Sequence, residues 1–98
     1  MRETLTPEEK EKILRACFKT LDPPVLKQYT NKPGKKPAVL EQAARAFEPG
    51  KHYTEREITQ ALGRVWEDPI LLRRDMVEYG VLSRTRDGRD YWLTEEEK

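Results

Sequence analysis

The sequence of 98 residues is poor in the side chains on which catalysis and metal binding most often depend. It contains one cysteine, Cys17, and one histidine, His52, which exclude an internal disulfide bond and a zinc site of the usual type. The five glycines are isolated from one another, so the chain has no glycine-rich loop that could hold a phosphate. We therefore expect no enzyme, no metal and no cofactor.

Long hydrophobic runs are also missing. No apolar stretch approaches the roughly 18 residues that a membrane-spanning helix needs. The segment 1–12 is rich in charged residues and lacks the apolar centre of a signal peptide. These absences predict a cytoplasmic protein without membrane contact.

The chain also has no large excess of positive or negative charge. Lys and Arg number 19 and Asp and Glu number 18, so the net charge is +1. This balance is unlike that of a protein that coats nucleic acid, although a local basic face remains open. Charged residues make up 38% of the chain and hydrophobic residues 36%, which predicts one small domain with a thin core.

Helix start signals occur at three places in the chain. Thr6-Pro7-Glu8-Glu9 and Thr54-Glu55-Arg56-Glu57 are capping boxes, and Asp68-Pro69 combines an N-cap residue with a proline in the first helical position. Apolar residues at helical spacing follow each signal, and a further helix should begin near Pro37. Gly80 is a typical stop for the last of these four helices.

The C-terminal part has a strand pattern. Residues 81–86 and 89–93 flank Asp87-Gly88, a dipeptide typical of a two-residue hairpin turn. Short extended segments are also expected at 25–29 and at 52–53. The order of elements predicts an α+β, mainly helical fold: a winged helix-turn-helix core over 25–93, with the hairpin as the wing, an added N-terminal helix within 1–24, and an acidic tail at 94–98.

The added helix carries an apolar stripe that must be buried somewhere. Its members share helical spacing and are Ile13, Leu14, Cys17, Phe18 and Leu21. The stripe either folds back on its own domain or pairs with a second copy across a two-fold axis, which would make the protein a homodimer.

The fourth helix is the candidate recognition helix. At 100° per residue, Arg73 falls inside the apolar arc, where its charge needs a carboxylate partner, so a salt bridge at the core edge is expected. The opposite arc holds Leu71, Arg74, Asp75 and Glu78, a poor set for the major groove because two acids repel phosphates.

Basic residues gather at two further places. A two-residue turn would place Arg86 opposite Arg89 and Arg84 opposite Tyr91 in the hairpin. Arg84, Arg86 and Arg89 then share one face with Tyr91, which is typical of a wing that contacts nucleic acid but also of a charged, solvated sheet edge. The candidate nucleic-acid-binding residues share a basic side chain near these elements: Lys35, Lys36, Arg74, Arg84, Arg86 and Arg89. The residues expected to have structural roles are Arg73, Trp66, Tyr79 and Trp92.

Several segments together resemble a bacterial family catalogued as domain of unknown function twenty eighty-seven. They are Tyr53 to Ile58, Leu72 to Arg84, Asp87-Gly88 and Tyr91-Trp92, and the resemblance runs from about Tyr29 to Trp92. The resemblance implies a winged-helix-like domain, found alone or attached to transcriptional regulators, and implies no reaction. Members often have Asn where this chain has Thr59.

Two functional hypotheses remain open. The first is a DNA-binding transcriptional regulator, or a domain associated with one, that uses the wing arginines. The second is a winged-helix module that binds a protein partner without direct DNA contact. A continuous positive stripe from Lys35 through Arg74 to Arg86 would favour DNA, whereas a patchwork of charges with an exposed apolar groove would favour a protein.

Overall fold

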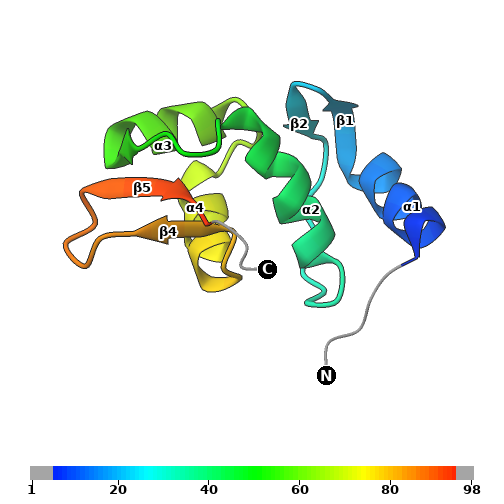
Figure 1. Ribbon diagram of the computed structural model, residues 1–98. Helices are drawn as coiled ribbons and strands as arrows, with labels where there is room; N and C mark the ends of the chain where they lie inside the picture. The colour runs from blue at the N-terminus through cyan, green and yellow to red at the C-terminus, as the bar shows by residue number, and fades with distance from the viewer. Residues whose placement is uncertain (1–5, 95–98) are drawn as a thin grey trace.

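A computed structural model describes residues 6–94 of the chain. Its helices in this range are α1 (Pro7–Cys17), α2 (Lys36–Ala43), α3 (Glu55–Gly63) and α4 (Pro69–Glu78), with a short 3-10 helix, η1 (Ala44–Ala46), after α2. Its strands are β1 (Phe18–Leu21), β2 (Pro24–Leu26), β3 (Tyr53–Thr54), β4 (Leu82–Arg84) and β5 (Asp90–Leu93). The chain is therefore a small α+β domain in which α1 and the β4–β5 hairpin lie at opposite ends, with α2 between them (Figure 1).

The predicted start of the first helix is confirmed, but the prediction that this helix continues through Leu21 to the prolines at 23–24 is wrong. Thr6 caps α1 in a reciprocal capping box with Glu9. The helix ends at Cys17, and β1 then pairs antiparallel with β2. Leu21 therefore lies on a strand, where 41% of its surface is exposed. The apolar residues keep a helical spacing through β1, but the backbone hydrogen bonds of this segment are made with β2 and not within a helix.

The second sheet has the strand order β3-β5-β4, so the first strand of the three lies beside the last. Both neighbouring pairs are antiparallel, and Arg84 faces Tyr91 as predicted. The two helices before the hairpin have the predicted starts: Thr54 forms a capping box with Glu57, and the Asp68 side chain accepts a hydrogen bond from the backbone N–H of Leu71. Gly80 ends α4 with a φ of 80°.

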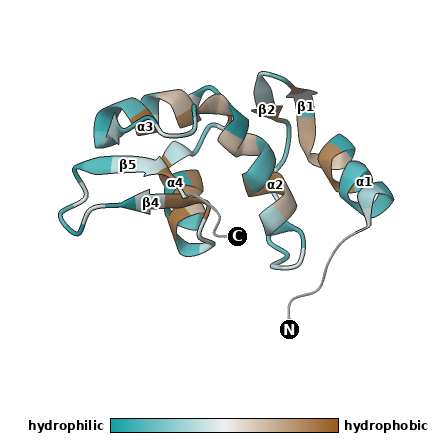
Figure 2. Ribbon diagram, viewed as in Figure 1, coloured by the Kyte–Doolittle hydropathy of each residue, from teal (hydrophilic) through white to brown (hydrophobic). Residues whose placement is uncertain are grey.

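The core lies where α2, α3 and α4 meet the second sheet. Its fully buried side chains share apolar character and are Leu40, Ile58, Leu62, Leu72, Met76 and Val39. Figure 2 shows hydrophobic segments on α2 and α4 in the middle of the molecule and a hydrophilic turn at the tip of the hairpin. From the α1 stripe, Ile13 and Cys17 join this core, as does Phe18 at the start of β1. These three side chains are thus buried within the chain itself.

The predicted structural aromatics differ in their contact with the core. Trp66 packs partly buried against it, and 37% of Tyr79 is exposed. Tyr91 is buried, whereas Trp92 on the other face of the sheet is partly exposed, as adjacent strand residues should be. The Trp92 ring stacks on His52, with 4.8 Å between ring centroids.

Candidate nucleic-acid interface

Helix α4 divides into a buried face and an exposed first turn. Leu72 and Met76 have no exposed surface, because they point into the core. Ile70 and Leu71, in the first turn, are 51% and 39% exposed. Arg74 lies one turn further along the exposed side, and none of the carboxylates in residues 6–94 forms an ion pair with it. The exposed side of α4 therefore combines two aliphatic side chains with an unpaired guanidinium group.

The placement of Asp75 corrects the expectation that it lies on the exposed arc of α4. Only 7% of Asp75 is exposed. The hydroxyl of Tyr29 donates a hydrogen bond of 2.7 Å to its Oδ2, and the ammonium group of Lys36 lies 3.0 Å from the same oxygen. The chain before α2 therefore crosses this face of α4, which a helical wheel drawn for one helix cannot reveal.

The same cluster explains where the two candidate lysines lie. The Lys36 side chain is 17% exposed, and its Nζ also lies 5.4 Å from the centroid of the Tyr29 ring and 5.9 Å from that of Tyr79. Lys36 is thus an internal partner of Asp75, whereas the neighbouring Lys35 is exposed. Burial, the hydrogen bond to Asp75 and the charge of that carboxylate raise the pKa of Tyr29 well above its ordinary value of 10.0.

Arg73 forms the core-edge salt bridge that its position predicted. Its Nη1 lies 3.2 Å from Oε2 of Glu55 and donates a hydrogen bond of 2.8 Å to Oγ1 of Thr59. Its guanidinium carbon lies 5.7 Å from the centroid of the Tyr91 ring. Thr59 thus holds a guanidinium group that links α3 to α4. With 16% of its side chain exposed, Arg73 has lost most of its contact with water.

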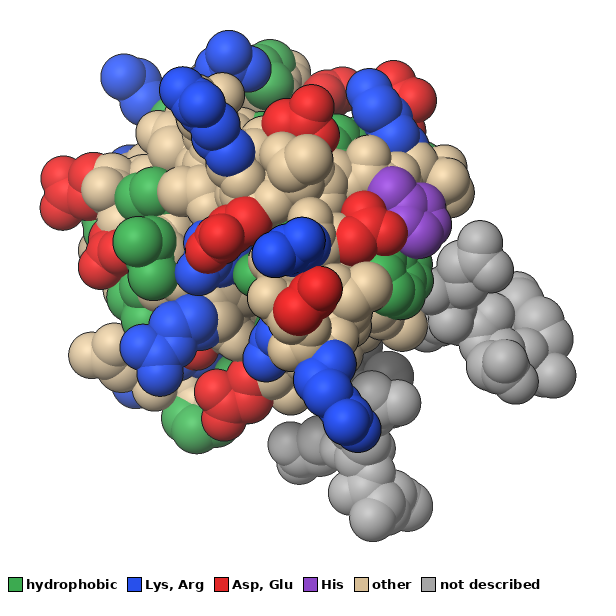
Figure 3. All heavy atoms as spheres, turned by 90° about the vertical axis from the view of Figure 1, so that its left-hand side faces the viewer, with side chains coloured by type: hydrophobic (Ala, Val, Ile, Leu, Met, Phe, Trp, Pro, Cys, Tyr) green, Lys and Arg blue, Asp and Glu red, His purple; other side chains and the backbone are tan. Residues whose placement is uncertain are grey.

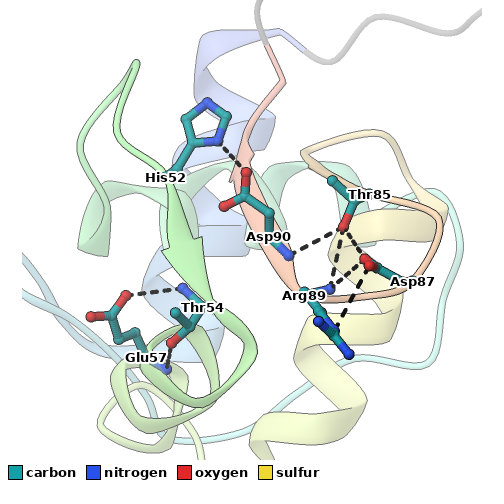
Figure 4. Close-up of polar contacts among 7 residues, drawn as sticks. All are labelled: His52, Thr54, Glu57, Thr85, Asp87, Arg89 and Asp90. Atoms are coloured by element: carbon teal, nitrogen blue, oxygen red, sulfur yellow. Dashed lines mark hydrogen bonds and ion pairs between the residues drawn. The ribbon is translucent and has the colours of Figure 1, made fainter.

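The hairpin turn is longer than the predicted two-residue turn. The N–H of Gly88 donates to the carbonyl of Thr85, and the Thr85 hydroxyl donates to Asp87 (Figure 4). Arg86 and Arg89 therefore belong to the turn rather than to a facing pair of strand residues, since β4 ends at Arg84 and β5 begins at Asp90. Hydrogen bonds from Thr85 and from the backbone N–H of Arg89 lower the pKa of Asp87, which stays charged at the tip.

The three arginines of the hairpin differ in the interactions that they make within the chain. Arg84 donates from Nη1 to the carbonyls of Thr85 and Arg86, at 3.1 and 3.3 Å. The Nε of Arg89 lies 3.8 Å from Asp87, in an exposed ion pair. Within residues 6–94, no carboxylate lies within ion-pair distance of Arg84 or Arg86. These two guanidinium groups are available to an anion.

An open groove of about 460 Å³ separates α4 from the hairpin. Its lining combines three arginines, three acids and a buried tyrosine: Arg73, Arg74, Arg84, Glu55, Glu78, Asp87 and Tyr91, with Val77 and Gly88. The groove thus brings together Arg74 and Arg84, two of the six candidate binding residues, and places Lys35 and Lys36 elsewhere. The face in Figure 3 shows acidic and basic side chains interspersed, rather than a continuous positive stripe.

One contact at the site has no signal in the sequence: 46 positions separate Tyr29 and Asp75. Tyr91, by contrast, was expected beside the hairpin arginines, and it lies opposite Arg84. In the described part of the chain, no three His, Cys, Asp or Glu side chains are grouped as metal ligands, and no helix has the length and apolarity to cross a membrane.

The fold and the groove define a small α+β domain with an arginine-lined surface between a helix and a hairpin. The sequence profile of a bacterial family described as "Uncharacterized protein conserved in bacteria (DUF2087)" matches residues 25–93. The chain belongs to this family, and the match confirms the resemblance found in the sequence. No curated protein and no solved structure matches the chain.

Proposed function

We propose that this protein is a winged-helix domain that binds DNA in the bacterial cytoplasm, as a transcriptional regulator or a domain associated with one. The element order supports the proposal: α2, β3, α3 and α4 precede a hairpin, and the strands are arranged β3-β5-β4. In this reading α4 is the recognition helix and β4–β5 is the wing.

The burial of Asp75 is the observation that carries the proposal. An exposed acid in this position would repel phosphates from α4, but Tyr29 and Lys36 hold Asp75 inside the domain. Arg74 and Arg84 line the groove, Arg86 lies in the hairpin turn, and none of the three has a carboxylate partner in the described chain. The balance of exposed charges around α4 and the hairpin is therefore more favourable to DNA than the number of acidic and basic residues in the sequence suggested.

Fluorescence anisotropy with a labelled duplex of mixed sequence tests the proposal. At low salt we expect binding in the micromolar range, which is typical of non-specific association. Neutralisation of about three phosphates by the three free arginines predicts a slope of log K against log salt of about −3. The absence of binding at tens of micromolar protein would contradict the proposal.

One observation favours a second function, a module that binds a protein. Ile70 and Leu71 are exposed on the same helix as the charged side chains of Arg74 and Glu78, a combination suited to a protein partner. A stoichiometric protein captured from a nuclease-treated lysate, and lost with the variant Ile70→Asp, would support this function.

A further inference from the structure

The hydroxyl of Tyr91 is a polar group whose partner the described chain does not supply. Only 4% of Tyr91 is exposed, and residues 6–94 offer this hydroxyl no hydrogen bond. The described residues contain no fully enclosed and unpaired side-chain N or O atom, so the hydroxyl contacts the open space of the groove that Tyr91 lines. A buried side chain thus directs a hydrogen-bond donor into a cavity.

The guanidinium group of Arg84 lies beside this hydroxyl. A methyl group added at Gly88 would lie 3.7 Å from Nη1 of Arg84 and 3.9 Å from the hydroxyl of Tyr91. One small group can therefore reach both. Nη1 of Arg84 donates its two hydrogens to the carbonyls of Thr85 and Arg86, which fixes the direction of the group and leaves Nη2 and Nε as its donors for a ligand. The contact of Tyr91 with Arg73 fixes the ring. A ligand would meet donors that are already in place.

The charges of the groove indicate which anion it suits. Arg73 pairs with Glu55, and Asp87 lies beside Arg89. The lining itself carries three arginines and three carboxylates; because Arg89 neutralises Asp87 from outside the lining, Arg74 and Arg84 are left against the single carboxylate of Glu78, an excess of one positive charge. A phosphodiester carries one negative charge, whereas a phosphate monoester carries about 1.5 to 2 at pH 7. The excess matches the diester.

We infer that the groove between α4 and the hairpin is a seat for one backbone phosphodiester of DNA, which accepts hydrogen bonds from the Tyr91 hydroxyl and the Arg84 guanidinium group. The inference rests on the proposed DNA-binding function and names the residues that would contact one phosphodiester of the DNA backbone. Tyr91 contributes a neutral donor, and Arg84 contributes both a donor and a charge.

The variant Tyr91→Phe tests the seat because it removes the hydroxyl and keeps the ring under Arg73. We expect its Kd for the labelled duplex to rise about 10-fold, as for a lost hydrogen bond to a charged group. Its salt slope should match that of the wild type, since no charge is lost. Arg84→Gln should weaken binding and also reduce the slope by about 1. Tyr79→Phe, an exposed tyrosine outside the groove lining, is the matched control and should bind as the wild type does.

The possible results distinguish a failure of the proposed phosphodiester seat from a failure of the proposed DNA-binding function. A wild type that binds duplex with the same Kd as Tyr91→Phe overturns the seat and leaves DNA binding intact. A wild type that does not bind duplex overturns both. Inorganic phosphate that replaces chloride at constant ionic strength should not displace the duplex, and displacement would contradict a seat selective for the diester. Thermal unfolding of each variant, followed by circular dichroism, confirms that the folded protein is measured.

Discussion

Replacement of Asp75 by Asn removes the negative charge at the centre of the Tyr29, Asp75 and Lys36 cluster and changes little in volume. At a separation of 3.0 Å and an effective dielectric constant of about 20, the attraction between Lys36 and Asp75 is about 5 kcal/mol before desolvation is subtracted. Loss of one partner from a buried ion pair costs about 3–5 kcal/mol. Asn can still accept a hydrogen bond from Tyr29, and Lys36 keeps some contact with water. We therefore expect a loss of about 2–3 kcal/mol in the free energy of unfolding.

Urea unfolding, followed by the fluorescence of Trp66 and Trp92, measures this loss. Glu78→Gln is the matched control, since Glu78 is an exposed acid of the same helix, and it should change stability by less than about 0.5 kcal/mol. In a double-mutant cycle with Lys36→Met, the two losses should add to more than the loss in the double variant. If Asp75→Asn unfolds as Glu78→Gln does, the cluster does not hold the chain before α2 against α4.

Three further predictions concern other groups. The pKa of Tyr29 is raised in the folded state, so its contribution to stability is complete below its unfolded pKa of about 10 and is lost as pH rises above that value. In urea titrations at several pH values, Tyr29→Phe should therefore lose less stability than the wild type at alkaline pH, and a pH profile identical to that of the wild type would contradict this prediction. Burial raises the pKa of the Cys17 thiol, which is 5% exposed, so a thiol reagent should label the native protein far more slowly than the protein in urea, whereas equal rates would show that the α1 stripe is open. Thr54→Ala removes the cap of α3 and should lower stability by about 1 kcal/mol in the same unfolding assay, with Gln60→Ala, at an exposed position of the same helix, as the comparison.

Most of the fold could be predicted from local signals in the sequence. The caps at Thr6, Thr54 and Asp68 were predictable because each depends on residues three positions apart. The hairpin register was predictable for the same reason, although the turn at its tip is longer. The strand at Phe18–Leu21 was not predictable, since its apolar spacing fits a helix and its partner strand decides the outcome.

The candidate site was predictable only in part. Arg73 was placed correctly because a charge inside an apolar arc needs a partner, and Glu55 supplies it. Asp75 and Lys36 were placed on the surface because the pattern of one element says nothing about a chain segment that crosses it. Contacts such as that between Tyr29 and Asp75 arise from tertiary packing, which no periodicity records.

The most direct test of DNA binding at this surface is an NMR titration of the ¹⁵N-labelled protein with duplex DNA at low salt. We expect shifts in amide resonances to concentrate in the first turns of α4 and in the β4–β5 hairpin, including Arg74, Arg84 and Tyr91. The α1 helix, at the opposite end of the molecule, should stay unchanged (Figure 1). Shifts centred on α1, or a spectrum that DNA leaves unaltered, would contradict it.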